Sequence, residues 1–207
     1  MRMRKKKWVS SFLESEQEYL IEDFKDFETD KPVYIEIGMG MGDFITESAL
    51  LNPDIFYVGL ERVEVCVARA IKKAQENELD NFRVMLKDAE NIVEVCGENS
   101  VDLIYLHFSD PWPKSRTHKR RLTYMSFLEK YEKVLKKDGI LIFKTDNESF
   151  YDDSLEYFKQ SSFELQDSSR NYYVEGEPMT GYQAKFVAEG KPIYYARYRV
   201  NKENENI

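Results

Sequence analysis

Carboxylates recur wherever an apolar, strand-length segment of this sequence ends. The set comprises Glu36, Glu61, Asp88 with Glu90, Asp110 and Asp146. A carboxylate at such a point can accept hydrogen bonds from both hydroxyl groups of a ribose, or balance a positive charge on a ligand. One acid of this kind is usually only solvated, but the whole series predicts a ligand site that several strands share.

Three glycines at alternate positions, Gly38, Gly40 and Gly42, follow the first of these segments. They allow the backbone to turn sharply and to approach a ligand closely. Glu61, about 20 residues further on, suits the ribose of a nicotinamide cofactor and that of S-adenosylmethionine equally. Asp43 stands where a pyrophosphate-binding loop has its third glycine, and an acidic helix start is poorly suited to a diphosphate. The pattern therefore favours S-adenosylmethionine over a nicotinamide cofactor.

The adenine of S-adenosylmethionine could be bound by the three residues that follow the segment 82–87, which are Asp88, Ala89 and Glu90. Their carboxylates can accept hydrogen bonds from the adenine amino group. The sulfonium and amino group of S-adenosylmethionine also tolerate nearby carboxylates, because both are cationic.

The segment from 107 to 121 joins an acidic, aromatic turn to a dense basic run. Pro111 and Pro113 prevent both a continuing strand and an immediate helix, so Asp110 and Trp112 are expected on a stiff loop. The cations that follow, which are expected to contact RNA phosphates, are Lys114, Arg116, Lys119, Arg120 and Arg121.

The net charge is −8, and a second basic group lies within residues 2–7. An acidic body with two basic patches can bind RNA locally and repel it elsewhere, which favours one docking orientation. A disordered, solubilising tail is an equally good interpretation of the N-terminal group. His107 and His118 are interpreted as structural or phosphate-facing residues rather than as catalytic bases.

Strand-like and helix-like segments alternate through most of the 207 residues, which predicts an α/β domain with a parallel sheet. The expected strands are 31–38, 55–61, 82–87, 101–108, 140–146, 163–168 and 192–200. The expected helices are 44–51, 63–76, 88–95, 124–136 and 148–160, with one or two more within 10–27. Residues 170–190 are expected to be irregular. We therefore divide the chain into a basic N-terminal arm and helix (1–30), one domain (31–200) and a tail (201–207).

The sequence has no membrane-length apolar run and no signal-peptide pattern, so a cytoplasmic protein without a membrane partner is expected. Cys66 and Cys96 lack metal-ligand spacing, and no metal site is predicted.

Several motifs together closely resemble the bacterial tRNA (guanine-N7)-methyltransferases, the TrmB family. The matching blocks are Glu36-Ile-Gly-Met-Gly-Met-Gly42, Gly59-Leu-Glu61, Asp88-Ala-Glu90, Phe108-Ser-Asp-Pro-Trp-Pro-Lys114, Lys119-Arg-Arg-Leu122, Lys144-Thr-Asp146 and Met179-Thr-Gly-Tyr182. The resemblance covers nearly the whole chain, and the Asp-Pro-Trp-Pro-Lys block is highly specific.

The resemblance implies a class I methyltransferase (Rossmann-like) fold, with helices on both faces of a seven-stranded, mostly parallel sheet whose last strand is antiparallel. It implies transfer of a methyl group from S-adenosyl-L-methionine to a variable-loop guanine of tRNA, by a monomer or a homodimer. By position, Glu36, Glu61, Asp88 and Asp110 match the donor site, and Asp110 is also the proposed catalytic residue. The positions that match the substrate site, or adjoin it, are Lys114, Asp146, Thr180, Tyr182 and Gln183.

Two positions depart from the family pattern. Arg116-Thr-His-Lys-Arg-Arg121 carries its histidine one place later than usual, and Gln183 stands where the family has glutamate. A carboxylate accepts hydrogen bonds from guanine more strongly than an amide oxygen does, so Gln183 implies weaker binding of the base.

Guanine N7 has an in-plane lone pair and no proton, so methyl transfer needs alignment more than a base. Asp110 is therefore expected to orient the reactants and to offset charge, while Trp112 either stacks on the target base or only packs. The alternatives are a methyltransferase that acts on another nucleobase nitrogen, a nicotinamide-dependent reductase, and a non-catalytic RNA-binding protein.

Overall fold

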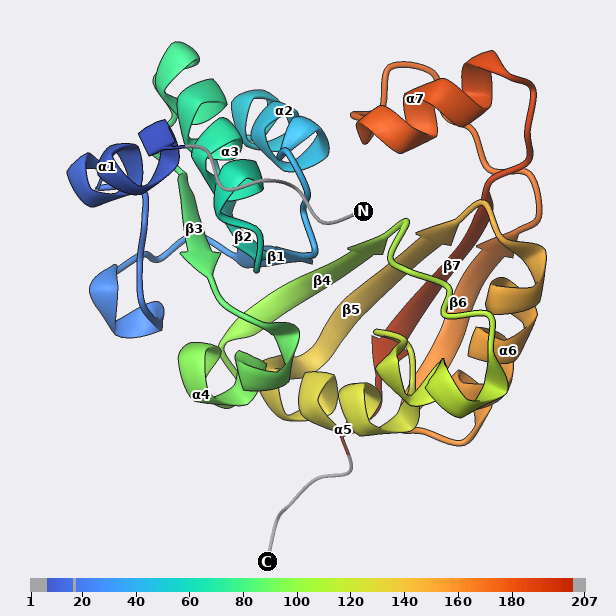
Figure 1. Ribbon diagram of the computed structural model, residues 1–207. Coiled ribbons are helices and arrows are strands. Elements are labelled where there is room, and N and C mark those ends of the chain that lie inside the picture. The colour runs from blue at the N-terminus through green and yellow to red at the C-terminus, as the bar shows by residue number, and fades with distance from the viewer. Residues whose placement is uncertain (1–6, 17, 203–207) are drawn as a thin grey trace, which may run out of the picture.

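A computed structural model describes residues 7–16 and 18–202 of the chain (Figure 1). Within these residues one sheet contains β1 (Val33–Ile37), β2 (Phe56–Glu61), β3 (Phe82–Leu86), β4 (Val101–His107), β5 (Leu135–Thr145), β6 (Phe163–Ser169) and β7 (Tyr194–Val200). The helices are α1 (Lys7–Ser15), α2 (Asp43–Leu51), α3 (Glu64–Glu76), α4 (Ile92–Cys96), α5 (Met125–Val134), α6 (Glu148–Lys159) and α7 (Gly181–Ala188). Three short 3₁₀ helices are η1 (Phe24–Asp26), η2 (Ala89–Asn91) and η3 (Ser115–Arg120).

The strand order is β3-β2-β1-β4-β5-β7-β6, and β7 is antiparallel to both of its neighbours. The pairs among β1 to β5 are all parallel. This topology confirms the expected seven-stranded, mostly parallel sheet with an antiparallel last strand. It also brings the carboxyl ends of β1, β2 and β4 to one edge, where ligands of such sheets bind.

Two apolar layers hold the helices against the two faces of the sheet. Phe127 and Phe150, from α5 and α6, pack in one layer, and Ile45 and Ile71, from α2 and α3, pack in the other. Ile35 on β1 is 0% exposed, as expected for a central strand that is covered on both sides. Helices on both faces are therefore confirmed, and the site loops extend from a rigid, buried support.

The glycine turn between β1 and α2 forms as expected. Gly42 has φ of 75°, a left-handed conformation that side chains with a Cβ rarely adopt. A Cβ added there would lie 2.7 Å from the Cβ of Ala70, so α2 and α3 can approach this closely only because the residue is glycine. The turn thus holds the start of α2 against α3.

Three segments differ from the sequence-based expectation. The helix expected over 124–136 ends at Val134, and β5 begins at once at Leu135. Asp138 and Gly139, interpreted as a helix stop, lie instead in an irregular part of β5, where the register with β4 shifts and Asp138 has φ of 62°. A turn signal inside a strand marks a bulge as readily as it marks a helix end, which explains the error.

The other two differences concern helices. The segment 170–190, expected to be irregular, contains α7, which Thr180 caps by accepting a hydrogen bond from the backbone N–H of Gln183 (3.0 Å). Near the N-terminus, the helical part of the region 10–27 is α1 and the single turn η1. Residues 2–6 of the basic N-terminal group (2–7) and most of the expected tail lie outside the described residues, whereas Lys7 begins α1.

Candidate active site

A pocket of about 760 Å³ opens at the carboxyl edge of the sheet. It is lined by ten of the predicted site residues, which are Gly38, Glu61, Asp88, Ala89, Glu90, Asp110, Trp112, Lys119, Arg120 and Tyr182. These residues come from five separate segments of the chain. The structure therefore brings together, around one cavity, four of the six predicted acids, the aromatic loop and part of the basic run.

Glu61 links the end of β2 to the glycine turn. Its Oε1 accepts hydrogen bonds from the backbone N–H groups of Arg62 (2.8 Å) and Val63 (2.9 Å), and its Oε2 accepts one from the N–H of Gly40 (3.2 Å). The carboxylate is only 9% exposed but still borders the pocket. It is thus held rigidly where a ribose could reach its remaining acceptor positions.

The acids after β3 are differently engaged. Asp88 is exposed and accepts a hydrogen bond from the backbone N–H of Glu90 (3.1 Å), while the Glu90 carboxylate pairs with Lys130 on α5. The Oδ2 of Asp88 also lies 3.7 Å from a guanidinium nitrogen of Arg62, so both acids are partly occupied, although both still line the pocket.

Glu36 lies in the interior and is not among the residues that line the pocket. Its carboxyl group is 1% exposed, and its Oε1 lies 3.2 Å from Nδ1 of His107, which is buried as well. Within the described residues, Oε2 of Glu36 and Nε2 of His107 have no hydrogen-bond partner. Direct contact of Glu36 with the donor remains a prediction, and His107 is structural rather than phosphate-facing. Gly40 and Gly42 likewise shape the turn without lining the pocket.

Burial shifts both members of this pair toward their neutral forms. It raises the pKa of Glu36 well above its ordinary value, although the Lys144 ammonium opposes the shift. It lowers the pKa of His107 well below 6.5, and Lys144 reinforces that shift. A neutral imidazole and a protonated or nearly neutral carboxyl group can share this site without an uncompensated charge.

We expect the contribution of His107 to the stability of the fold to decrease as the pH falls below 6.5, a trend that the raised pKa of Glu36 opposes. Below this pH the unfolded chain binds a proton on His107 that the native state does not bind. This contribution to the free energy of unfolding therefore falls by up to about 1.4 kcal/mol per pH unit. Urea unfolding of wild type and His107→Asn at several pH values checks this. The stability difference between them should change below the unfolded pKa and stay constant above it, and a difference independent of pH would contradict the assignment.

The loop after β4 is stiff, as expected. Phe108 has φ of 51° and Trp112 has φ of 41°, so two residues with side chains adopt left-handed backbone on either side of Asp110. Such conformations cost about 1–3 kcal/mol each and persist only where the surroundings enforce them. Asp110 itself is exposed and faces the pocket, and the Arg120 guanidinium lies 5.0 Å from the centre of the Trp112 ring.

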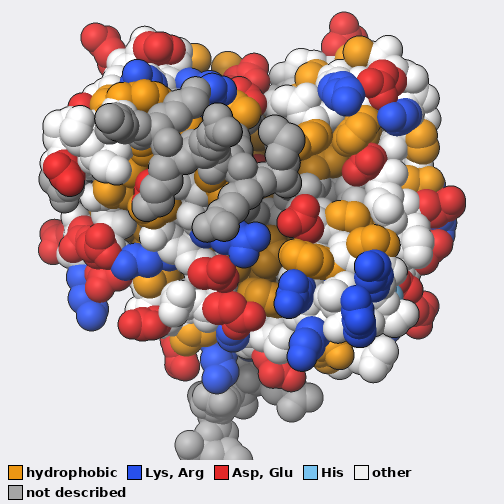
Figure 2. Space-filling view, in the orientation of Figure 1, with side chains coloured by type: hydrophobic (Ala, Val, Ile, Leu, Met, Phe, Trp, Pro, Cys, Tyr) orange, Lys and Arg blue, Asp and Glu red, His pale blue; other side chains and the backbone are white. Residues whose placement is uncertain are grey.

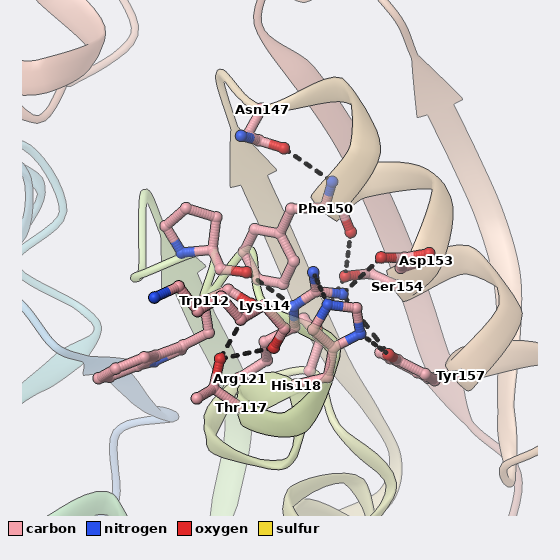
Figure 3. A network of polar contacts seen from close by, with 12 residues as sticks. Trp112, Lys114, Thr117, His118, Arg121, Asn147, Phe150, Asp153, Ser154 and Tyr157 are labelled. Atoms are coloured by element: carbon pink, nitrogen blue, oxygen red, sulfur yellow. Dashed lines mark hydrogen bonds and ion pairs between the residues drawn. The ribbon is translucent and has the colours of Figure 1, made fainter.

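Arg121 departs from its expected role, since it is 2% exposed and cannot reach phosphate without leaving its site. Figure 3 shows its guanidinium inside the loop. Nε donates to the carbonyl oxygen of Pro111 (2.7 Å), one Nη donates to Asp153 on α6 (2.7 Å), and the other lies 2.9 Å from Nε2 of His118. Arg121 therefore ties the Asp110 loop to α6, and His118 takes part in this internal network.

The remaining cations of the run, Lys114, Arg116, Lys119 and Arg120, are exposed. Figure 2 shows Lys and Arg side chains grouped over this loop, beside acidic and apolar side chains. The exposed part of the basic run is thus adjacent to the pocket, as a contact with RNA near a target base requires.

The C-terminal substrate positions lie on and beside α7, which stands beyond the carboxyl ends of β4 and β5 (Figure 1). Tyr182 is 65% exposed and lines the pocket. Gln183 is 1% exposed, and its Oε1 has no hydrogen-bond partner within the described residues. Asp146 is exposed directly after β5, outside the pocket lining. Of these C-terminal substrate positions, only Tyr182 therefore lines the pocket.

Sequence reasoning missed much of the apolar wall of the pocket. This wall includes Ile37, Leu60, Val63, Leu122 and Phe127. Ile37 and Leu60 could have been found, because each adjoins a predicted site residue at a strand end. Phe127 comes from α5, distant along the chain, and no local signal marks it.

These residues fit S-adenosylmethionine. The pocket offers apolar walls for an adenine and carboxylates for a ribose and for cationic groups. In the described part of the chain no group of three or more His, Cys, Asp or Glu side chains could hold a metal ion. No helix in the same part is long and apolar enough to cross a membrane.

The strand order, the antiparallel β7 and the pocket define a class I methyltransferase. Residues 30–196 match a family model described as a putative methyltransferase. Solved structures of this fold include an antibiotic related methyltransferase (TM-score 0.61, 19% identity, covering 98% of this chain and 96% of that one). A rRNA methylase from Streptococcus thermophilus is similar too (TM-score 0.57, 13% identity, 97% and 100% covered). At these identities the likeness concerns the fold alone.

Curated relatives define the family more narrowly. A tRNA (guanine-N(7)-)-methyltransferase of Lachnoclostridium phytofermentans is 46% identical over 81% of this chain and 80% of its own. Enzymes of the same name from Geobacillus sp. (43%; 94% and 93% covered) and Bacillus subtilis (40%; 95% and 97% covered) match nearly end to end. The chain belongs to the tRNA (guanine-N(7)-)-methyltransferase family.

Proposed function

We propose that the protein transfers a methyl group from S-adenosyl-L-methionine to N7 of a variable-loop guanine in tRNA. The observation that carries the proposal is the single pocket in which Glu61, Asp88 and Asp110 meet the exposed cations Lys119 and Arg120. A site for a small cationic donor thus opens directly onto a surface suited to phosphates. The protein acts in the cytoplasm, as a monomer or a homodimer.

The donor, when bound, supplies an electrophilic methyl group. Glu61 would hold its ribose and Asp88 its adenine, while Asp110 would orient the reactants and offset the positive charge that develops on the purine. No residue has to remove a proton, because guanine N7 carries none, so alignment is the main contribution of the chain. Trp112 shapes the binding site of the target base. The Arg120 guanidinium lies over the Trp112 ring and holds that ring in position.

The proposal is tested by incubating the protein with labelled S-adenosylmethionine and unmodified tRNA, then locating the methyl group by nuclease digestion and mass spectrometry. The expected product is 7-methylguanosine at one variable-loop position. A methyl group on another nucleobase nitrogen would replace the proposed atom, and tRNA binding without transfer would indicate a non-catalytic RNA-binding protein. A thermal-shift comparison of S-adenosylmethionine with nicotinamide cofactors separates the two donor classes.

Charge reversal of Lys119 and Arg120 together is expected to weaken tRNA binding and flatten its salt dependence. Loss of two phosphate contacts should reduce the slope of log K against log salt by roughly 1.5. The measurement is tRNA affinity at several salt concentrations. A matched control reverses Lys133 and Lys137, which lie at the end of α5 and the start of β5, away from the pocket. If both double variants keep the wild-type slope, Lys119 and Arg120 do not contact phosphate.

A further inference from the structure

Lys144 is a buried cation at the carboxyl end of β5. It is 1% exposed, and its Nζ lies 3.2 Å from Oε1 of Glu177 and 4.6 Å from the centre of the Tyr172 ring. Burial lowers the pKa of the ammonium, and the Glu177 carboxylate is the main group that opposes this shift. An ammonium so far from water depends on this partner to remain charged.

The second oxygen of Glu177 is used as well. The Tyr172 hydroxyl donates to Oε2 of Glu177 (2.8 Å), and the Tyr172 ring stacks on Tyr195 at 4.2 Å between centroids. Tyr195 lies on β7 directly opposite Lys144 in the strand register. We refer to Lys144, Tyr172, Glu177 and Tyr195 as the Lys144 cluster. The cluster closes a ring of contacts between β5, β7 and the segment 170–180.

The Lys144 cluster lies between two predicted substrate positions, Asp146 after β5 and Thr180 at the start of α7. Lys144 is two residues before Asp146, and Glu177 is three residues before Thr180, which caps α7. The far side of α7 contacts the loop after β4, since the rings of Phe186 and Phe108 lie 5.9 Å apart. The position of α7 above the pocket is therefore set by the cluster at one end and by Phe108 at the other.

We propose that Lys144, Glu177 and Tyr172 are positioning residues that fix the segment 178–183 relative to Asp146, so that the base-recognising groups face Asp110. The inference rests on the proposed function, which makes the segment 178–183 part of the guanine site. The rival view is that the cluster only stabilises the fold.

Glu177→Gln tests the proposal, because it keeps the shape of the side chain and removes its charge. We expect KM for tRNA to rise about tenfold, as a small misplacement of positioning groups allows, with kcat and the affinity for S-adenosylmethionine within about twofold of wild type. Tyr172→Phe keeps the ring stack and should give a smaller rise. The matched control is Glu175→Gln, an exposed carboxylate in the same segment, which should leave KM for tRNA unchanged.

The double variant Lys144→Met, Glu177→Gln separates positioning from stability. Removing both charges avoids an unpaired buried ammonium and should restore the thermal midpoint lost in Glu177→Gln. If the cluster positions the segment, KM for tRNA stays raised in the double variant. If KM recovers together with stability, or if donor affinity falls in parallel with KM, the positioning role is overturned.

A measurement that does not depend on enzyme activity keeps this test separate from the test of the proposed function. Amide hydrogen exchange of residues 178–188 should be faster in Glu177→Gln than in wild type and in Glu175→Gln. A wild-type protein that does not methylate tRNA would overturn the proposed function, whereas unchanged exchange in Glu177→Gln would overturn the inference.

Discussion

Replacing Asp110 with alanine is expected to lower kcat/KM for methyl transfer by about 10²- to 10³-fold, the range seen when one preorganised electrostatic group is lost. The carboxylate is the only acid on the rigid loop between Phe108 and Trp112, whose left-handed backbone holds it toward the pocket. Because Asp110 is exposed, and no hydrogen bond within the described residues holds its side chain, the fold should be unaffected. Steady-state methylation of tRNA, with thermal unfolding measured in parallel, checks both statements.

Two further variants define the role of Asp110. Asp110→Asn keeps the size of the side chain and removes its charge, so a loss close to that of Asp110→Ala would identify charge balance as its contribution. Asp54→Ala removes an exposed acid before β2 and should have no effect. Near-wild-type turnover in Asp110→Ala would remove this residue from the mechanism.

Arg121→Ala is expected to destabilise the protein by about 2–4 kcal/mol and to abolish most activity as well. The change leaves the carbonyl of Pro111 without its donor, unpairs Asp153 and removes the guanidinium that lies 5.1 Å from the Phe150 ring centre. Asp153 is partly exposed and can be resolvated, which keeps the cost below that of a fully buried pair. The free energy of unfolding from urea titrations measures the effect.

Arg120→Ala is the matched control, since Arg120 is the neighbouring residue, is exposed and lines the pocket. It should leave stability nearly unchanged and weaken tRNA binding. The opposite pattern, with Arg120 needed for stability and Arg121 for RNA affinity alone, would show that the network in Figure 3 does not hold the loop.

Local chemistry explains why much of the fold and the site could be predicted. The alternation of apolar strands with amphipathic helices already implied a parallel sheet, and such a sheet places its strand ends at one edge. Glu61, Asp88 and Asp110 consequently meet at one pocket, although the last two are 22 residues apart in the chain. Pro111 and Pro113 likewise determined a loop at the end of β4, because proline excludes both regular structures.

Burial and long-range partners had to come from the tertiary structure. Five cations in the run look alike in the sequence, yet Arg121 is enclosed because Asp153, 32 residues further on, lies within 2.7 Å of it. Glu36 ends a strand as Glu61 does, but the glycine turn and His107 leave its carboxyl group in the interior. The sequence by itself therefore determined the fold and the donor class, and it predicted ten of the residues that line the pocket. Which charged groups face the ligand and which support the loops was decided only by packing between distant segments, because desolvation depends on neighbours that the local sequence does not specify.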